Sequence, residues 1–250
     1  MLDTAAWALG VRDRLAEQGD RHRAEFERAY LKSSRPHLGV RVPLVRATVR
    51  EALRDSGPRG VPERDLALRL AAALWSLPEY ECHLAAVEVL VRGRRRLSLD
   101  DLPAVEGYLR EAGTWALVDP LAVEVVGDVV ARADASGDAG TATQVLDSWA
   151  VDRDFWVRRT ALLAHLRPLR QGGGDPDRFL RYADAMLEER EFFVRKAIGW
   201  VLRETGRRRP ELVADWLRPR AARCSGVTMR EAVKPLPPEV REELLAVRRR

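Results

Sequence analysis

With 250 residues, 46% of them apolar, the chain can bury a large core, and its net charge of +5 is compatible with a nucleic-acid partner. Two distant cysteines, Cys82 and Cys224, argue against a disulfide framework, and four scattered histidines without ligand spacing predict no metal site. No segment has the character of a signal peptide or a membrane span, so we expect a cytoplasmic protein without a membrane partner.

The expected elements are helices, because Ala, Leu, Arg and Glu dominate and no stretch alternates long enough to make a convincing strand. In chain order, Tyr30 lies in AYLKSSRPHLGVRVP, before a turn at Gly39 and a helix that should begin at Pro43. The segment EYECHLAAVEVLV, residues 79–91, is a fainter copy of a repeat that recurs about two periods further along the chain. The sequence has no phosphate-binding glycine loop, nucleophile elbow or dinucleotide fingerprint, so we expect no cofactor.

The next segment, TWALVDPLAVEVV over residues 114–126, places Trp115 and Asp119 four positions apart. On a helix the two side chains would share a face, one turn apart, where a carboxylate beside an indole could stabilise a developing cation. The competing interpretation makes Asp119 the N-cap of a helix that begins at Pro120. Local sequence favours this cap.

An internal repeat follows. DFWVRRTALLAHL, residues 154–166, aligns without gaps on EFFVRKAIGWVLR, residues 191–203, at an offset of 37 residues. That offset lies within the range of helical-hairpin repeats such as HEAT, with residues 171–177 (QGGGDPD) as a loop between repeats. We therefore predict an all-α fold of HEAT-like helical hairpins stacked into a curved α-solenoid with a concave basic face, as a single domain over residues 1–250.

Within the second repeat, apolar side chains from 193 to 202 share one helical face. Lys196 and Arg203 lie on the opposite face with Trp200 beside them, whereas the earlier repeat has Leu163 at the tryptophan's place. Trp200 is therefore either a functional ring on a basic surface or an amphipathic ring packed at a repeat boundary. Arg159 matches Lys196, so we expect both cations on the same side of the array, naturally the concave one.

Charge is concentrated in this part of the chain. Residues 1–150 carry 20 basic and 23 acidic side chains, a net charge of −3, whereas residues 151–250 carry 23 and 15, a net charge of +8. A localised basic surface is what phosphate binding requires.

Taken in order, six segments resemble the AlkD-type alkylpurine DNA glycosylases: YLKSSRPHLGV, LWSLPEYE, TWALVD, FWVRRTALLAHL, EFFVRKAIGWVLRETGRRRPELV and TMREAVK. The resemblance runs from Tyr30 to Lys234, and its most specific element is EFFVRKAIGWVLRE. It implies a HEAT-like repeat protein that acts on duplex DNA containing N3- or N7-alkylated purines.

The resemblance also assigns roles to single residues. It implies catalytic roles for Asp119, Trp115 and Trp200 on a concave face. It implies DNA binding by the tyrosine and the basic side chains that match the family's pattern: Tyr30, Arg158, Arg159, Lys196 and Arg203. The enzyme would be monofunctional, without a lysine nucleophile, and would not extrude the base into a pocket, so bulky adducts could be accepted.

The sequence departs from the family's pattern at Thr114 and Ala116, where a tryptophan and an acid are common, and Pro120 could reorient Asp119. Two other functions therefore stay open: a non-catalytic repeat protein that binds distorted or branched DNA, and a protein–protein scaffold. We expect a monomer, because repeat arrays often present one continuous binding face.

Overall fold

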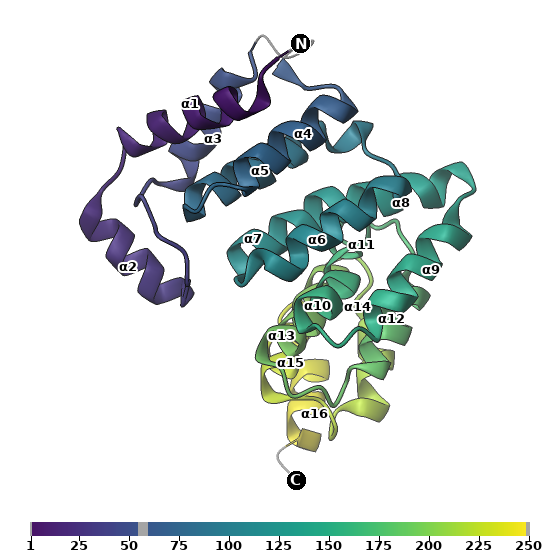
Figure 1. Ribbon diagram of the computed structural model, residues 1–250. Coiled ribbons are helices and arrows are strands. Elements are labelled where there is room, and N and C mark those ends of the chain that lie inside the picture. The colour runs from purple at the N-terminus through teal and green to yellow at the C-terminus, as the bar shows by residue number, and fades with distance from the viewer. Residues whose placement is uncertain (1, 55–59, 249–250) are drawn as a thin grey trace. The chain divides into compact units, whose positions relative to one another are not determined.

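The computed structural model describes residues 2–54 and 60–248 (Figure 1). These residues are helical or irregular, with no strand among them, which confirms the all-α prediction. The first helices are α1 (Thr4–Ala16), α2 (Arg21–Leu31), α3 (Val42–Ala52), α4 (Arg64–Trp75), α5 (Tyr80–Gly93), α6 (Leu102–Ala112), α7 (Trp115–Pro120) and α8 (Gly127–Ser136). They are followed by α9 (Ala139–Ala150), α10 (Phe155–Leu163), α11 (Leu166–Arg170), α12 (Pro176–Ala185), α13 (Phe192–Gly206), α14 (Pro210–Leu217), α15 (Gly226–Ala232) and α16 (Pro238–Arg248). None of the helices in the described ranges is both long and apolar enough to cross a membrane.

Contacts between Cα atoms divide the chain into two compact units. Unit 1 comprises residues 1–101 and 111–121, and unit 2 comprises residues 102–110 and 122–250. The chain passes from one unit to the other at three points: at the start of α6, near the end of α6 and just after α7. The single domain expected over residues 1–250 stays a prediction.

In unit 1, α5 packs against α1, α3, α4 and α7. Its sequence, YECHLAAVEVLVRG, is apolar on nearly all sides, and most of its residues are buried. Helix α2 is the contrast: its sequence RHRAEFERAYL is strongly polar, and none of its residues is buried. Asp20 caps its start by accepting a hydrogen bond from the Arg23 amide, and Lys32 ends it in a left-handed conformation with φ of 51°.

In unit 2, α13 packs against α10, α11, α14 and α15. The approach to α15 is close at Gly199, where a Cβ atom would lie 2.8 Å from the Thr228 carbonyl oxygen. A larger residue there would separate the two helices. Helices α10 and α13 begin at Phe155 and Phe192, so the 37-residue offset of the sequence repeat is also the offset of the helices.

Candidate nucleic-acid interface

Asp119 lies inside a helix, which makes the N-cap interpretation wrong. Helix α7 begins at Trp115, and the Thr114 side chain caps it by accepting a hydrogen bond from the Ala116 amide. Pro120 is therefore the sixth residue of this helix and not the first residue of the next. A proline inside a helix lacks its N–H and crowds the preceding turn, and the chain changes directly afterwards to a π-helix over Leu121–Val126.

Trp115 and Asp119 thus stand one turn apart on α7, as the first interpretation expected, and both side chains are partly exposed. Tyr30, at the end of α2, is 65% exposed, and its ring meets the edge of Trp115 at a centroid distance of 6.5 Å and an angle of 85°. Within unit 1 the structure therefore brings together three residues that the resemblance assigned to the site.

Phe26 joins this group, although sequence reasoning did not single it out. It is 66% exposed and lies parallel to Tyr30, with ring centroids 6.3 Å apart and planes within 4°. The signal was present in the sequence, because two aromatic residues four positions apart in an otherwise polar helix form an exposed stripe. Phe26, Tyr30 and Trp115 are called the aromatic stripe below.

Arg35 fixes the backbone that leads into α7. Its guanidinium donates hydrogen bonds to the carbonyls of Glu111 and Ala112, 2.5 and 3.2 Å away, at the end of α6. Its Nε donates to Nε2 of His83 at 3.2 Å. Burial lowers the pKa of His83, so its neutral ring can accept this bond. The turn before Trp115 is thereby tied to α5.

In unit 2, α13 has the expected two faces. Five of the six residues expected on the apolar face are buried, and Phe193, the sixth, is only partly buried; the five are Val194, Ala197, Ile198, Val201 and Leu202. Lys196 is exposed, with Nζ 5.8 Å from the centre of the Phe192 ring, and Trp200 is half-buried one turn further along. Arg203 forms ion pairs with Glu231 and Glu204, so its charge is already partly neutralised.

Arg159 does not lie on the surface, contrary to the expectation that it faces the same side as Lys196. It is 2% exposed, its Nη1 donates to the Phe193 carbonyl, and its guanidinium carbon lies 5.8 Å from the centre of the Phe193 ring. Arg158 is also engaged, in an ion pair with Glu189 at 2.7 Å and in hydrogen bonds to two carbonyls. Helix α13 packs over Arg159, a contact that no local pattern reveals.

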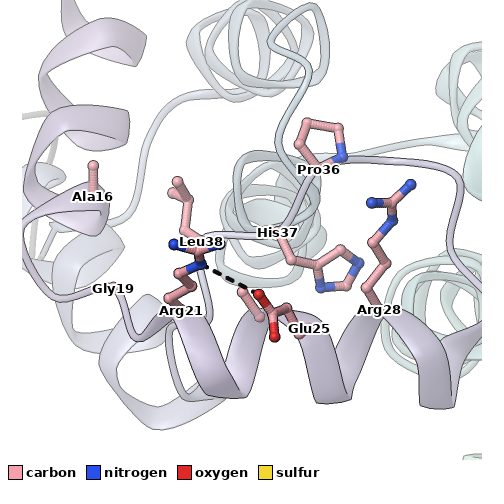
Figure 2. A pocket seen from close by; sticks show the side chains of 9 residues that line it. Ala16, Gly19, Arg21, Glu25, Arg28, Pro36, His37 and Leu38 are labelled. Atoms are coloured by element: carbon pink, nitrogen blue, oxygen red, sulfur yellow. Dashed lines mark hydrogen bonds and ion pairs between the residues drawn. The ribbon is translucent and has the colours of Figure 1, made fainter.

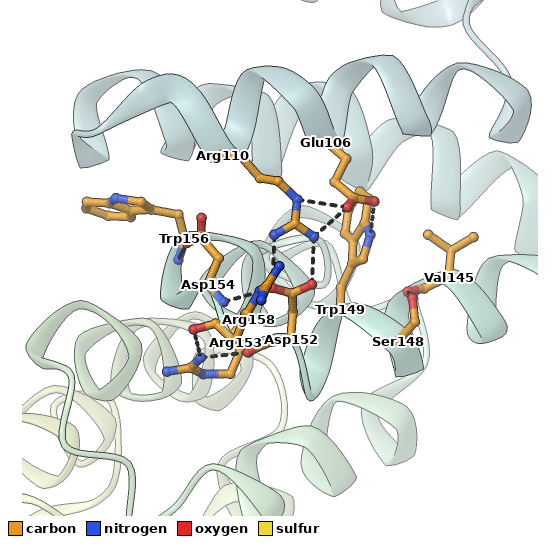
Figure 3. Close-up of polar contacts among 10 residues, drawn as sticks. All are labelled: Glu106, Arg110, Val145, Ser148, Trp149, Asp152, Arg153, Asp154, Trp156 and Arg158. Carbon is orange, nitrogen blue, oxygen red and sulfur yellow. Dashed lines mark hydrogen bonds and ion pairs between the residues drawn. The ribbon is translucent and has the colours of Figure 1, made fainter.

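A polar network holds the start of α10 (Figure 3). Arg110 forms ion pairs with Glu106 and Asp152, both at 2.6 Å, and Glu106 also accepts a hydrogen bond from the indole of Trp149. The hydrogen bonds from Arg110 lower the pKa of Asp152 to about 2. Asp152 in turn accepts from the amide of Asp154, whose side chain caps α10. The network therefore determines where α10 begins.

Comparison with known proteins decides the family. A profile of the DNA alkylation repair enzyme family matches residues 11–236. The chain belongs to this family. A solved structure described as a predicted DNA alkylation repair enzyme from Enterococcus faecalis shares the fold, with a TM-score of 0.74 and 23% sequence identity. The match covers 87% of this chain and 96% of that one, whereas no curated protein matches the chain.

In this alkylation-repair protein the repeat extends two residues further than sequence reasoning used. DRDFWVRR, residues 152–159, matches EREFFVRK, residues 189–196, so Arg153 and Arg190 are equivalent. Both are exposed, one residue before the N-cap of α10 and α13 respectively. Together with Lys196 they are the exposed cations of the repeat, and extending the alignment upstream would have found them.

Proposed function

We propose that this protein is a monofunctional DNA glycosylase that hydrolyses the N-glycosidic bond of cationic N3- or N7-alkylated purines in duplex DNA. The observation that carries the proposal is the pair on α7. Asp119 lies one turn from Trp115, its helix is capped by Thr114 instead, and Tyr30 contacts the same tryptophan. A carboxylate among aromatic rings suits a substrate and a transition state that are both cationic.

The chemistry follows from the charge of the lesion. When the bond from C1′ to the purine nitrogen breaks, its electron pair neutralises the alkylated base, so the leaving group needs no general acid. Positive charge develops on the sugar, where the Asp119 carboxylate would stabilise it. Water then adds at C1′ and loses a proton to solvent, which leaves a free alkylpurine and an abasic site. Without a lysine nucleophile in these steps, the strand stays intact.

The aromatic stripe would hold the lesion-bearing nucleotide without a tight pocket. Phe26 and Tyr30 are about two-thirds exposed, so they offer open ring surfaces and leave room beside the base. Open rings tolerate large substituents better than an enclosing cavity does, and this openness supports acceptance of bulky adducts. Trp200, half-buried on α13, would contribute a further ring to the DNA strand.

Phosphate contacts would come mainly from Lys196, Arg153 and Arg190. All three are exposed, whereas Arg158 and Arg203 are held in ion pairs and Arg159 is buried. Exposed cations release condensed counterions from DNA without reading its sequence. We propose that Arg159 acts indirectly, by holding the start of α13 through the Phe193 carbonyl, and so positions Lys196.

The deciding experiment measures base release from duplex DNA that carries N7-methylguanine or a bulkier N3-alkyladenine. We expect the wild type to release the base and Asp119→Asn to lose at least 100-fold in rate, because the substitution removes the charge that stabilises the transition state (on the order of 3 kcal/mol or more). Asp119→Asn should bind the same duplex nearly as well as the wild type.

Asp138→Asn is the matched control, because Asp138 is an exposed aspartate at the start of α9 whose side chain makes no capping hydrogen bond. It should release base at the wild-type rate. Wild-type protein that binds the duplex but releases neither base would contradict the glycosylase proposal and favour a non-catalytic DNA-binding protein. Duplex binding that does not weaken with added salt would contradict both the glycosylase and the non-catalytic DNA-binding protein, and would favour a protein–protein scaffold.

A further inference from the structure

Helix α2 carries Phe26 and Tyr30, yet it has no buried residue to fix it in place. Most helices in proteins are stabilised by packing an apolar face against a core. The ordering of α2 therefore needs another source, and three side chains next to the helix supply a candidate.

Glu27 of α2, His37 of the segment between α2 and α3, and Glu81 of α5 converge. Each offers one ligand atom, and these three atoms all lie within 4.8 Å of one another. Glu81 is completely buried, and the side chain of Glu27 is only 22% exposed. Two carboxylates held this close repel each other unless a positive charge compensates them. Glu27 has such a charge from Arg23, which pairs with it at 2.5 Å, and a metal ion between the two carboxylates would compensate Glu81 as well.

The ring nitrogens of His37 are available to bind a metal ion. Both ring nitrogens are buried and hydrogen-bond to nothing within the part of the chain that the structure describes. The ring is fixed by stacking on Tyr80, with centroids 4.4 Å apart and planes within 7°. Orphaned buried nitrogens are costly and rare in folded proteins.

The surroundings hold Glu81 in place and leave His37 a path to solvent, along a wall that also carries Arg21 and Arg28. Glu81 accepts hydrogen bonds from the amides of Leu38, Gly39 and Val40 at 2.9, 2.7 and 3.1 Å, which fix the position of its carboxylate. Figure 2 shows His37 on the wall of an open hollow of about 410 Å³ beside α2. A hydrated ion could therefore reach the ring from solvent.

We propose that Glu27, His37 and Glu81 bind a divalent transition-metal ion such as Zn²⁺ or Mn²⁺, and that this ion ties α2 to α5. One imidazole nitrogen with carboxylate oxygens is a ligand set that these metals accept, with water in the remaining positions. Tetrahedral ligands at about 2.1 Å from a metal lie about 3.4 Å apart, so rotation of the Glu27 side chain would close the site. The ion neutralises the carboxylates, satisfies His37 and fixes the helix that carries Tyr30.

The spacing rule that predicted no metal site looks for ligands that are neighbours in sequence. These three come from two helices and a connecting segment, so only folding brings them together. The role of the ion is structural and independent of the base-release chemistry, and it can be tested without DNA.

The test uses full-length protein treated with EDTA, dialysed and titrated calorimetrically with Zn²⁺ and, separately, with Mn²⁺. We expect one ion per chain, a rise in Tm and slower hydrogen exchange of the α2 amides. His37→Ala and Glu27→Gln should each lower the affinity at least 10-fold and abolish the rise in Tm. His22→Ala and Glu25→Gln, exposed side chains of the same helix, should behave as the wild type.

Far-UV circular dichroism of the metal-free variants checks that they fold. Glu27→Gln changes a residue on a surface helix, so it still tests the proposal if His37→Ala is unstable. Wild-type protein that binds neither ion would overturn the proposal. So would binding that the Glu27 and His37 variants retain in full, which would place the ion elsewhere. Base release by metal-free protein would leave the glycosylase proposal standing in either case.

Discussion

Helices α10 and α13 begin within two similar eight-residue segments, residues 152–159 and 189–196. Equivalent side chains of the two segments differ in how far they are exposed to solvent. The cation that ends the motif is Arg159 in α10, 2% exposed beneath Phe193, and Lys196 in α13, which is exposed. Two turns into each helix, Leu163 is completely buried, whereas its counterpart Trp200 is half-buried. A sequence repeat predicts equal helices, but not equal exposure.

The difference arises from what covers each helix. Helix α13 packs over α10 and covers Arg159. The guanidinium is therefore shielded from water and contacts the backbone carbonyl and the ring of Phe193 instead. Helix α15 meets α13 along the side that carries Gly199 and leaves Lys196 in solvent. The earlier helix of the pair therefore buries its cation in contacts within the protein, while the later one exposes its cation to solvent.

The largest effect is expected at the buried cation. Arg159→Ala leaves the Phe193 carbonyl without its donor and opens a cavity, which should cost about 2–4 kcal/mol of unfolding free energy. For a chain of this size that corresponds to a fall in Tm of roughly 5–10 °C, measured by calorimetry. Lys196→Ala, at the equivalent exposed position, should change stability by less than about 0.5 kcal/mol. Equal losses at the two positions would contradict the comparison.

A smaller effect concerns the network that holds α10. The pKa of Asp152 in the folded protein is about 2, below its ordinary value, so the stabilisation is fully present above about pH 4–5. It is lost as the pH falls towards 2. Arg110→Gln should lower the unfolding free energy at pH 7 by about 1–2 kcal/mol, and partial exposure of Arg110 keeps the loss this small. Urea unfolding at pH 7 and pH 3 should show that the difference in unfolding free energy between the wild type and Arg110→Gln is smaller at pH 3.

The smallest change in stability, with a distinct change in binding, is expected for the exposed cations. Lys196→Gln, Arg153→Gln and Arg190→Gln should each weaken duplex binding and reduce the slope of log affinity against log salt by about 1. Arg208→Gln, which removes an exposed charge beyond the other end of α13, is the control and should leave the slope unchanged. A slope that stays constant in all three variants would assign the phosphate contacts to other residues.

Some features of the candidate site could be predicted from the sequence, and others could not. The apolar and basic faces of α13 followed from a period of 3.6 residues, because helical residues spaced three and four apart lie on one face. The role of Asp119 as a cap was predicted from an Asp-Pro pair, and it was wrong because Thr114 starts the helix five residues earlier. The sequence contains two possible helix starts, one at Thr114 and one at Asp119. In the structure the helix starts at Thr114, and the resulting helix α7 packs on α5.

The sequence by itself determined the helical class, the 37-residue register of α10 and α13, the faces of α13 and the family. The helical class and the faces of α13 depend on residues close together in the chain, where backbone geometry repeats with a fixed period, and the register and the family depend on the order of residues along the chain. Tertiary structure decided that Arg159 is buried, that Phe26 lies on Tyr30 beside Trp115, and that Glu27, His37 and Glu81 converge. Burial and convergence depend on which element packs against which, and that choice is made by contacts between residues far apart in the chain.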